Sequence, residues 1–355
     1  MECLDPHQRP PDSIKDVYKK YQRMKLQDLD QDPDIVDLPK SLHTSAKDKV
    51  RIVEEWSGDD LTAAFRAFSG QDGQTYAALP SRIPVYEHAN LPGLHVVPNL
   101  LPPEIQSILL SRLLHRDLSN PAHLTNIHTH YNLSYQPSNP SFFTRPPTSS
   151  TPIAHPLDPA IHKPLTVPQL LNKKMRWTTL GGQYDWTSKR YPSTPPPPFP
   201  SDIRDLLESI WKSTKAEAAI VNLYSPGDTL SVHRDVAEMS GTGLVSVSLG
   251  CDAVFVIGTS PSPSASEEEG ERGEKIVTLR LRSGSAVYMS GPSRFAWHGV
   301  PQIVRGTCPE HLADWPAGLD GGDGNGSREG KGEFEAWRGW MGGKRVNLNV
   351  RQMWD

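Results

Sequence analysis

A series of short strand-like segments from Met175 to the C-terminus constrains the fold more than any other feature of the chain. The segments are alternating or β-branched and are separated by Gly, Ser, Asp and Pro: MRWTTLGG, AAIVNLY, LVSVSLG, AVFVIG, KIVTLRLRSGSAVYMSG and RVNLNVRQM. Such a series predicts an antiparallel sandwich or barrel, of jelly-roll type. A single helical pattern, PSDIRDLLESIWKST, interrupts it. We therefore predict a mainly β fold with flanking helices.

The chain divides near residue 90. We predict that residues 1–89 form a helical and irregular extension packed on the core, beginning with an amphipathic helix near Ser13. Residues 90–355 form the main domain, which opens with a short strand and a helix in GLHVVPNLLPPEIQSILLSRLL. Three segments interrupt it, the first of them a Pro-, Ser- and His-rich candidate for a lid or for disorder: 119–168, 258–275 and 305–343.

Length and cysteine content restrict the class of protein. A chain of 355 residues can bury a sizeable core, and its three cysteines are too few and too scattered for a disulfide framework. No apolar run is long enough to span a membrane, so we expect no membrane partner. Acidic residues throughout residues 1–30 make a mitochondrial leader less favoured, and we expect the nucleus, the cytoplasm or both.

The distribution of charged residues indicates that any surface for binding nucleic acid is a local patch and not the whole protein. The formal net charge is −4, and outside the acidic run Glu267–Glu274 the acidic and basic residues balance. Phosphate binding would therefore need a local basic patch. One candidate patch lies in and around the first strand-like segment: Lys173, Lys174, Arg176, Lys189 and Arg190. It could position a polynucleotide, or it could be an ordinary solvated surface.

A candidate metal site lies in the stretch NLYSPGDTLSVHRD. On a strand, His233 and Asp235 share one face, so both can reach one ion. A lone His-x-Asp is weak in a chain with 13 histidines and 41 acidic residues. The segment SRFAWHGVPQIV supplies His298 as a third ligand. Two imidazoles and one carboxylate are the ligands of non-haem Fe(II) oxygenases, and zinc could also accept them.

The last strand-like segment, RVNLNVRQM, supports an anion site beside the metal. Its polar residues share one strand face and its aliphatic residues share the other: Arg345, Asn347, Asn349 and Arg351 against Val346, Leu348 and Val350. Asn222 and Tyr224 similarly share one face. Guanidinium, amide and phenol groups suit a small dicarboxylate. The two arginines lie about 20 Å apart along an ideal strand, so their side chains must converge on the ligand or straddle it.

The order Asn-x-Tyr, His-x-Asp, a distant His and Arg-x-Asn-x-x-x-Arg resembles the AlkB family of Fe(II)- and 2-oxoglutarate-dependent dioxygenases. The segments RWTTLGGQYDWTSKRY, HRDVAE and MSGPSRFAWHGVPQIV are most similar to the eukaryotic AlkB homologue 1 branch, over roughly residues 90 to 355. The resemblance implies a double-stranded β-helix in which His233, Asp235 and His298 hold Fe(II). It also implies that 2-oxoglutarate is gripped at its distal carboxylate by Tyr224, Arg345 and Asn347, with Asn222 and Arg351 near its metal-chelating end.

The implied activity consumes O₂ and 2-oxoglutarate and hydroxylates or demethylates methylated bases in tRNA or DNA. Such a base must be unstacked against aromatic side chains. The candidates for substrate binding are Trp177, Tyr184, Trp186, Lys189 and Arg190. Of these, Trp177 fits the core better than the substrate site, and the aromatic residues could equally be packing an early strand. Bacterial members of the family place a second aspartate where this chain has Ala237, which weakens the inference about base recognition.

Two other functions compete with nucleic-acid demethylation. The same chemistry could act on protein side chains, histone tails included, or the fold could serve as a non-catalytic binding module. The complete set of three ligands and two arginines argues against the non-catalytic module.

Overall fold

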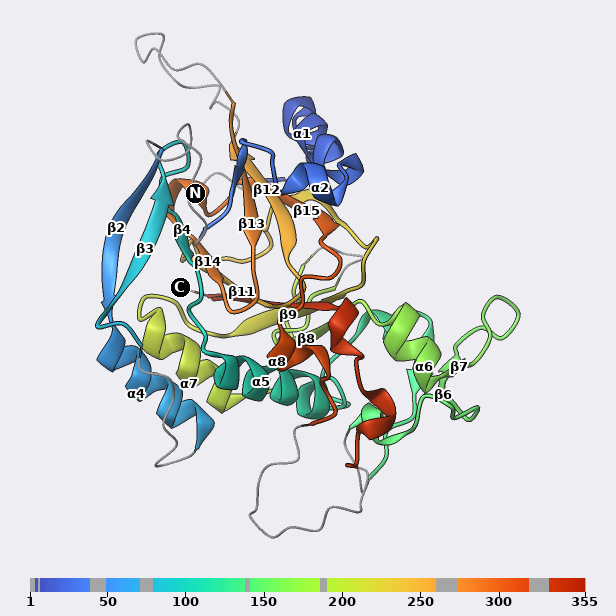
Figure 1. Cartoon of the computed structure of the whole chain (residues 1–355). Helices are drawn as coiled ribbons and strands as arrows, with labels where there is room; N and C mark the ends of the chain where they lie inside the picture. The colour runs from blue at the N-terminus through green and yellow to red at the C-terminus, as the bar shows by residue number, and fades with distance from the viewer. Residues whose placement is uncertain are drawn as a thin grey trace.

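A computed structural model describes residues 4–5, 7–38, 49–70, 79–137, 141–185, 190–259, 274–318 and 332–354. Two β-sheets face one another, and helices cover their outer sides (Figure 1). From β9 to β16 the chain crosses repeatedly between the two sheets, as in a jelly roll. The structure therefore confirms the predicted fold class.

The larger sheet has eight strands among the described residues. In spatial order they are β2 (Val50–Ser57), β3 (Arg82–His88), β4 (Leu94–Val97), β14 (Ala286–Met289), β11 (Leu244–Gly250), β16 (Arg345–Arg351), β9 (Ala218–Tyr224) and β8 (Trp177–Gly181). All neighbouring pairs are antiparallel. The segment expected to line a cavity, β16, lies between β11 and β9, well inside the sheet.

The smaller sheet carries two of the predicted metal ligands, His233 and His298. Its order is β1 (Ile35–Val36), β13 (Lys275–Leu281), β12 (Ala253–Thr259), β15 (Trp297–Ile303) and β10 (Leu230–His233). The pairs are antiparallel except that β1 runs parallel to β13. The space between the sheets is filled by aliphatic and aromatic side chains from both, among them Val287, Phe255 and Leu279. Alternation along each strand produces this core, because inward-facing positions recur every second residue.

Helices pack on the outside of the larger sheet. They are α4 (Gly58–Ser69), α5 (Pro103–Ser111), which continues as a π-helical segment over Arg112–Asp117, and α7 (Ser201–Ile210). Val346, Leu348 and Val350 of β16 face this layer. Their burial here leaves the polar face of β16 directed toward the space between the sheets.

The N-terminal helices cover the smaller sheet. Helix α1 (Asp12–Arg23) packs against β15 and β12, and the short α2 (Leu26–Leu29) follows it (Figure 1). Ile14 and Tyr21 of α1 are buried with Val254, Val256 and Trp297 of the sheet. The predicted helix near Ser13 is therefore present, and one of its faces completes the core on this side.

Residues 119–168 are not simply surface loops. They include β5 (Tyr131–Leu133), β6 (Pro152–Pro156) and β7 (Leu165–Thr166), which form a third sheet, followed by α6 (Val167–Gln169) and a π-helical turn over Leu170–Lys174. Buried side chains such as Phe143 and Ile153 join the main core. The composition was misleading because short proline-containing strands lack a sustained period, yet Ile153, Ala154 and Leu165 of these strands are buried.

The predicted boundary near residue 90 falls between β3 and β4, which are neighbours in one sheet. Within the predicted insert 305–343 the structure describes α8 (Glu310–Ala313) and short turns near Trp337 and Met341. Most of the acidic and the Gly-rich runs lie outside the described residues. In the part of the chain that is described, no helix is long and apolar enough to cross a bilayer.

Candidate metal and cosubstrate site

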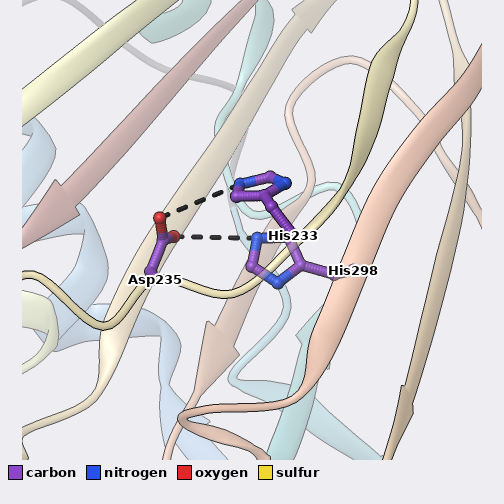
Figure 2. A group of neighbouring side chains, drawn as sticks. All are labelled: His233, Asp235 and His298. Atoms are coloured by element: carbon purple, nitrogen blue, oxygen red, sulfur yellow. Dashed lines mark ion pairs between the residues drawn. The ribbon is translucent and has the colours of Figure 1, made fainter. Parts of the chain in front are cut away.

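His233, Asp235 and His298 converge on one point between the sheets (Figure 2). Their ligating atoms all lie within 4.8 Å of one another. Nε2 of His233 is 3.8 Å from Oδ1 of Asp235, and Nε2 of His298 is 3.6 Å from Oδ2. Two imidazole nitrogens and a carboxylate at these separations can hold one divalent cation of the Fe(II) or Zn(II) type.

Adjacent strands bring the two histidines together. His233 ends β10 and stands opposite His298 of β15, with ring centroids 4.5 Å apart. Asp235 lies in the coil after β10, so the alternation of side chains along a strand does not by itself put it on the same face as His233. The ligating atoms of the three residues nevertheless converge.

Main-chain carbonyls fix the orientation of both imidazoles. Nδ1 of His233 donates to the carbonyl oxygen of Ser231 at 2.9 Å, and Nδ1 of His298 donates to that of Ala296 at 3.0 Å. A carbonyl oxygen can only accept, so each Nδ1 carries the proton and each Nε2 keeps its lone pair. This tautomer is the one that a metal ligand of this kind requires.

Electrostatics keep the two buried ligands in their metal-binding forms. Burial alone would raise the pKa of Asp235, but Arg351, His233 and His298 together lower it below its ordinary value. Burial, assisted by the charge of His233, lowers the pKa of His298 to about 4. At neutral pH the site therefore presents a carboxylate and a neutral imidazole.

A buried ion-pair network supports the Asp235 segment. Glu238 is fully buried, and its carboxylate accepts from Arg351 Nη1 at 2.9 Å and from Arg294 Nη2 at 3.1 Å. Arg294 also donates to the carbonyl oxygens of Asp235 (3.0 Å) and Thr242 (2.7 Å). Arg351 lies 3.4 Å from Asp235, at the metal end of the cavity as predicted.

The sequence analysis missed Glu238 and Arg294. Glu238 follows Asp235 by three residues in HRDVAE, and Arg294 precedes His298 by four in PSRFAWH. Neither segment has a periodicity that predicts burial of its charge. Only the fold, which brings Arg294 next to residues 56 positions away in the chain, shows that they pair.

A second cationic group lies deeper in the same space. Arg345 is only 1% exposed, and its Nη2 donates to Ser248 Oγ at 2.9 Å. Its Nε and Nη1 have no hydrogen-bond partner among the described residues, and neither does the buried hydroxyl of Tyr224, which stands opposite it on β9. Burial lowers the pKa of Arg345 to about 10, so the group is still cationic at neutral pH. Unpaired buried donors on a cation fit the carboxylate of a small acid.

The neighbouring polar residues complete this lining. Asn347 stands opposite Asn222 on β9, and it donates to Ser246 Oγ at 2.9 Å and to the carbonyl of Val247 at 3.0 Å. Ser246 and Ser248 were also missed, although both occupy the polar parity of LVSVSLG on β11. That alternation was a usable signal.

A cavity of about 370 Å³ opens over the triad. Its walls include Tyr184, Ile220, Arg234 and Ala237 together with the metal ligands His233 and Asp235. Tyr184 makes a T-shaped contact with Tyr191 at 5.3 Å. Burial, together with the charges of Asp235 and Glu238, raises the pKa of Tyr184 to about 12, so the phenol is neutral.

The other predicted substrate residues are dispersed. Trp177 is half-buried on the edge strand β8, opposite Asn222, and Arg190 is exposed beside Asp185. Trp186 and Lys189 lie outside the described residues. Lys173 and Lys174 are exposed and do not line the cavity over the triad.

Comparison with known proteins gives a consistent set of similarities. Residues 93–351 match the family model described as the 2OG-Fe(II) oxygenase superfamily. The chain is 45% identical to the N6-methyladenosine RNA demethylase ALKB1 of Pyricularia oryzae, over 99% of this chain and 98% of that protein.

Similarity extends to proteins from more distant organisms. The chain is 39% identical to the tRNA demethylase abh1 of Schizosaccharomyces pombe, over 76% of this chain and 82% of that protein. It is 32% identical to the nucleic acid dioxygenase ALKBH1 of Homo sapiens, over 52% and 48% of the two chains.

Proposed function

The chain belongs to the 2OG-Fe(II) oxygenase superfamily, as an AlkB-type dioxygenase close to the homologue 1 branch, and we propose that it demethylates methylated bases in RNA. Its metal is Fe(II), and its cosubstrates are 2-oxoglutarate and O₂. The proposal of RNA as substrate is supported by the printed activities of the relatives from Pyricularia oryzae and Schizosaccharomyces pombe.

The observation that carries the proposal is the convergence of three ligand atoms in a chain that also buries an arginine with unpaired donors. The atoms of His233, Asp235 and His298 lie within 4.8 Å of one another, and Arg345 keeps two donors without partners among the described residues. A buried, unpaired guanidinium lowers stability unless an anion pairs with it, so Arg345 fits a bound acid beside which the three metal ligands supply the reactive centre.

Each side chain of the site has a definable task. His233 and His298 would hold the iron through Nε2, because each Nδ1 is engaged with a carbonyl, and Asp235 would hold it as a carboxylate. When bound, Fe(II) with 2-oxoglutarate and O₂ supplies the oxidation that hydroxylates a C–H bond of the substrate, with release of succinate and CO₂.

The polar face of β16 would bind the cosubstrate. Arg345, Tyr224 and Asn347 provide a cation, a hydroxyl and an amide at the inner end of the space, as a carboxylate needs. Arg351 is held by Glu238 and Asp235 at the metal end. The fixed donors orient the bound acid without rearrangement, which is how such sites favour reaction over mere binding.

The cavity over the triad would receive one base. Its volume of about 370 Å³ and the ring of Tyr184 suit an unstacked base with its methyl group directed at the ligands. Hydroxylation of an N-methyl carbon gives a hemiaminal, whose collapse releases formaldehyde and restores the amine. The protein's contribution is to hold that carbon beside the metal and to exclude other C–H bonds.

The experiment is a mass-spectrometric count of modified nucleosides after incubation with iron, ascorbate and 2-oxoglutarate. Methylated RNA, the DNA oligonucleotide of equal sequence and a methylated histone peptide are compared. We expect loss of the methylated nucleoside from RNA with equimolar formaldehyde, and none with Asp235→Ala. Turnover of the peptide alone would overturn the proposal in favour of protein demethylation.

We also propose that the protein works in the nucleus, the cytoplasm or both, because acidic residues occur throughout residues 1–30. A fluorescent protein fused to the C-terminus tests this. Fungal cells suit the experiment, because the relatives from Pyricularia oryzae and Schizosaccharomyces pombe are fungal proteins. Accumulation in mitochondria would contradict it.

A further inference from the structure

A second cavity adjoins the one over the triad. It has a volume of about 430 Å³ and lies between the end of α1 and start of α2, the turn from β9 to β10, and the end of β15. Figure 1 shows α1 and α2 beside β15. Thr229 lines both cavities, so the second cavity, here called the groove, meets the first one at this residue.

The walls of the groove are fixed by specific contacts. Gln302 Nε2 on β15 donates to the carbonyl of Met24 at 3.1 Å, which joins the end of α1 to the sheet. On the opposite wall, the N–H of Ser225 donates to Asp228 Oδ2 at 2.7 Å and closes the β9–β10 turn. A preformed groove loses little conformational entropy when it binds a ligand.

The charge of the groove is positive. Lys25 and Arg305 are exposed in its lining, and neither has an acidic partner among the described residues. Asp228 is the only acid in that described lining, and it forms an ion pair with Arg176. Lys344 Nζ binds Ser225 Oγ at 2.7 Å in the same turn. In the described lining, two basic side chains therefore face one acidic side chain that is already paired.

We propose that this groove binds the backbone phosphates of the nucleotides next to the target base, an inference that rests on the proposed function. A base in the cavity over the triad stays attached to its strand, and that strand can continue past Thr229 into the groove. Lys25 and Arg305 would contact phosphates without reading base edges. The groove would thus hold a single RNA strand and add affinity that does not depend on sequence.

The groove also assigns a role to the N-terminal extension. Lys25 and Met24 lie outside residues 93–351 that match the family model, yet they form one wall beside the catalytic cavity. Arg176 extends the positive strip toward the predicted patch residues Lys173 and Lys174. That patch would therefore act at the far end of the groove rather than at the base itself.

The test is the salt dependence of binding to a methylated single-stranded RNA, measured by fluorescence anisotropy with metal-free protein. We compare wild type with the double substitution Lys25→Gln and Arg305→Gln. Loss of two phosphate contacts should reduce the slope of log Kd against log salt by about 1.4, because each contact on a single strand contributes about 0.7. Thermal unfolding of the variant should match wild type, since both side chains are exposed.

A matched control removes two positive charges from α1, away from the groove. Lys15 and Lys19 pair with Asp12 and Asp16, and neither lines the groove. Lys15→Gln with Lys19→Gln gives the same change in net charge and should keep the wild-type slope. An equal loss of slope in both double variants would mean a diffuse charge effect and would overturn the groove assignment.

The outcomes separate the groove from the proposed function. If wild type neither binds nor demethylates RNA, the proposed function fails. If wild type does both while Lys25→Gln with Arg305→Gln keeps the wild-type slope, the function stands and the groove is wrong. A methylated mononucleotide is a further probe: it cannot reach the groove, so its demethylation should be the same in the groove variant and in the control variant.

Discussion

Asp235 carries a negative charge in a buried site, which is costly unless cations lie close by. Burial raises its pKa, and Arg351 and the two histidines more than reverse that effect. Among the site residues, substitution of Asp235 discriminates most directly between an enzyme and a binding module.

We predict that Asp235→Ala lowers succinate formation by more than about a hundredfold, because even the loss of a group that supports a metal ligand costs about 10- to 100-fold. The measurement is 2-oxoglutarate turnover with and without RNA. His155→Ala, an exposed histidine of β6, is the control and should behave as wild type. Undiminished turnover in Asp235→Ala would refute the metal assignment.

Arg345 permits a prediction about affinity. Arg345→Ala removes charge-assisted hydrogen bonds worth about 1.5–3 kcal/mol, so the Kd for 2-oxoglutarate should rise about 10- to 150-fold. Anaerobic titration calorimetry measures it. Arg338→Ala is the control, because Arg338 is an exposed arginine that pairs with Asp314 and Glu335. Equal affinity in wild type and Arg345→Ala would exclude this arginine as the carboxylate anchor.

At the scale of elements, one buried carboxylate joins three segments of the chain. Glu238, in the coil after β10, contacts Arg351 of β16 and Arg294 of the segment before β15. The segment that carries Asp235 is therefore held between the two sheets. We therefore expect the loss of the Glu238 carboxylate to lower both the stability of the fold and the affinity for the metal.

Glu238→Gln should lower the free energy of unfolding by about 3–5 kcal/mol, because buried Arg294 loses its carboxylate partner and buried Arg351 keeps only Asp235. Urea denaturation measures this loss, and a titration with Fe(II) under nitrogen should show weaker binding in the same variant. Glu54→Gln on the exposed face of β2 should change stability by less than about 0.5 kcal/mol. Equal stability of the two variants would show that the network is not structural.

Helix α1 allows a test of the outer core. Ile14 is fully buried against the smaller sheet, so Ile14→Ala should lower stability by about 2–5 kcal/mol. Lys19→Ala on the exposed side of the same helix is the control. If chemical denaturation showed equal stability for both, α1 would not be packed on the sheet in solution.

The sequence predicted the parts of the site that follow strand periodicity. In β16 the aliphatic parity of RVNLNVRQM packs in the core under the helices, while Arg345 and Asn347 of the polar parity hydrogen-bond to serines of β11. The pairing of His233 with His298 was also found, because both lie on or beside strands with clear patterns. Period-two alternation is preserved wherever one face is buried and the other lines a cavity.

The sequence did not predict contacts that depend on tertiary structure. Glu238 and Arg294 read as ordinary surface charges, and only the meeting of two distant segments buries them. The third sheet of β5, β6 and β7 was missed because strands of two to five residues carry too few positions to show a period. The groove beside α1 likewise joins segments far apart in the chain.

At the scale of the molecule, the N-terminal extension and the catalytic core share their sheets. β2 and β3 extend the larger sheet beyond β4, and β1 pairs with β13 of the smaller one. Residues before 90 thus supply strands as well as α1, and the folding of the two parts should be coupled.

We predict that a chain shortened to residues 90–355 unfolds at a lower temperature than the full chain and aggregates more readily. Removal of β3 exposes the edge of β4, and removal of α1 exposes Val254, Val256 and Trp297. Calorimetry with light scattering measures both effects. A truncated chain with unchanged unfolding temperature would mean that residues 1–89 fold independently of the core.

The carbonyl groups of Ser231 and Ala296 aim the two imidazoles, and each belongs to the residue two positions before its histidine. Every amino acid has this main-chain oxygen, so the orientation of each imidazole is set by the path of the backbone and not by the side chain of the residue that supplies the carbonyl. Distant homologues could carry a different residue at position 231 and still hold the imidazole in the same orientation. An alignment would score that position as variable while it continued to set the geometry of catalysis.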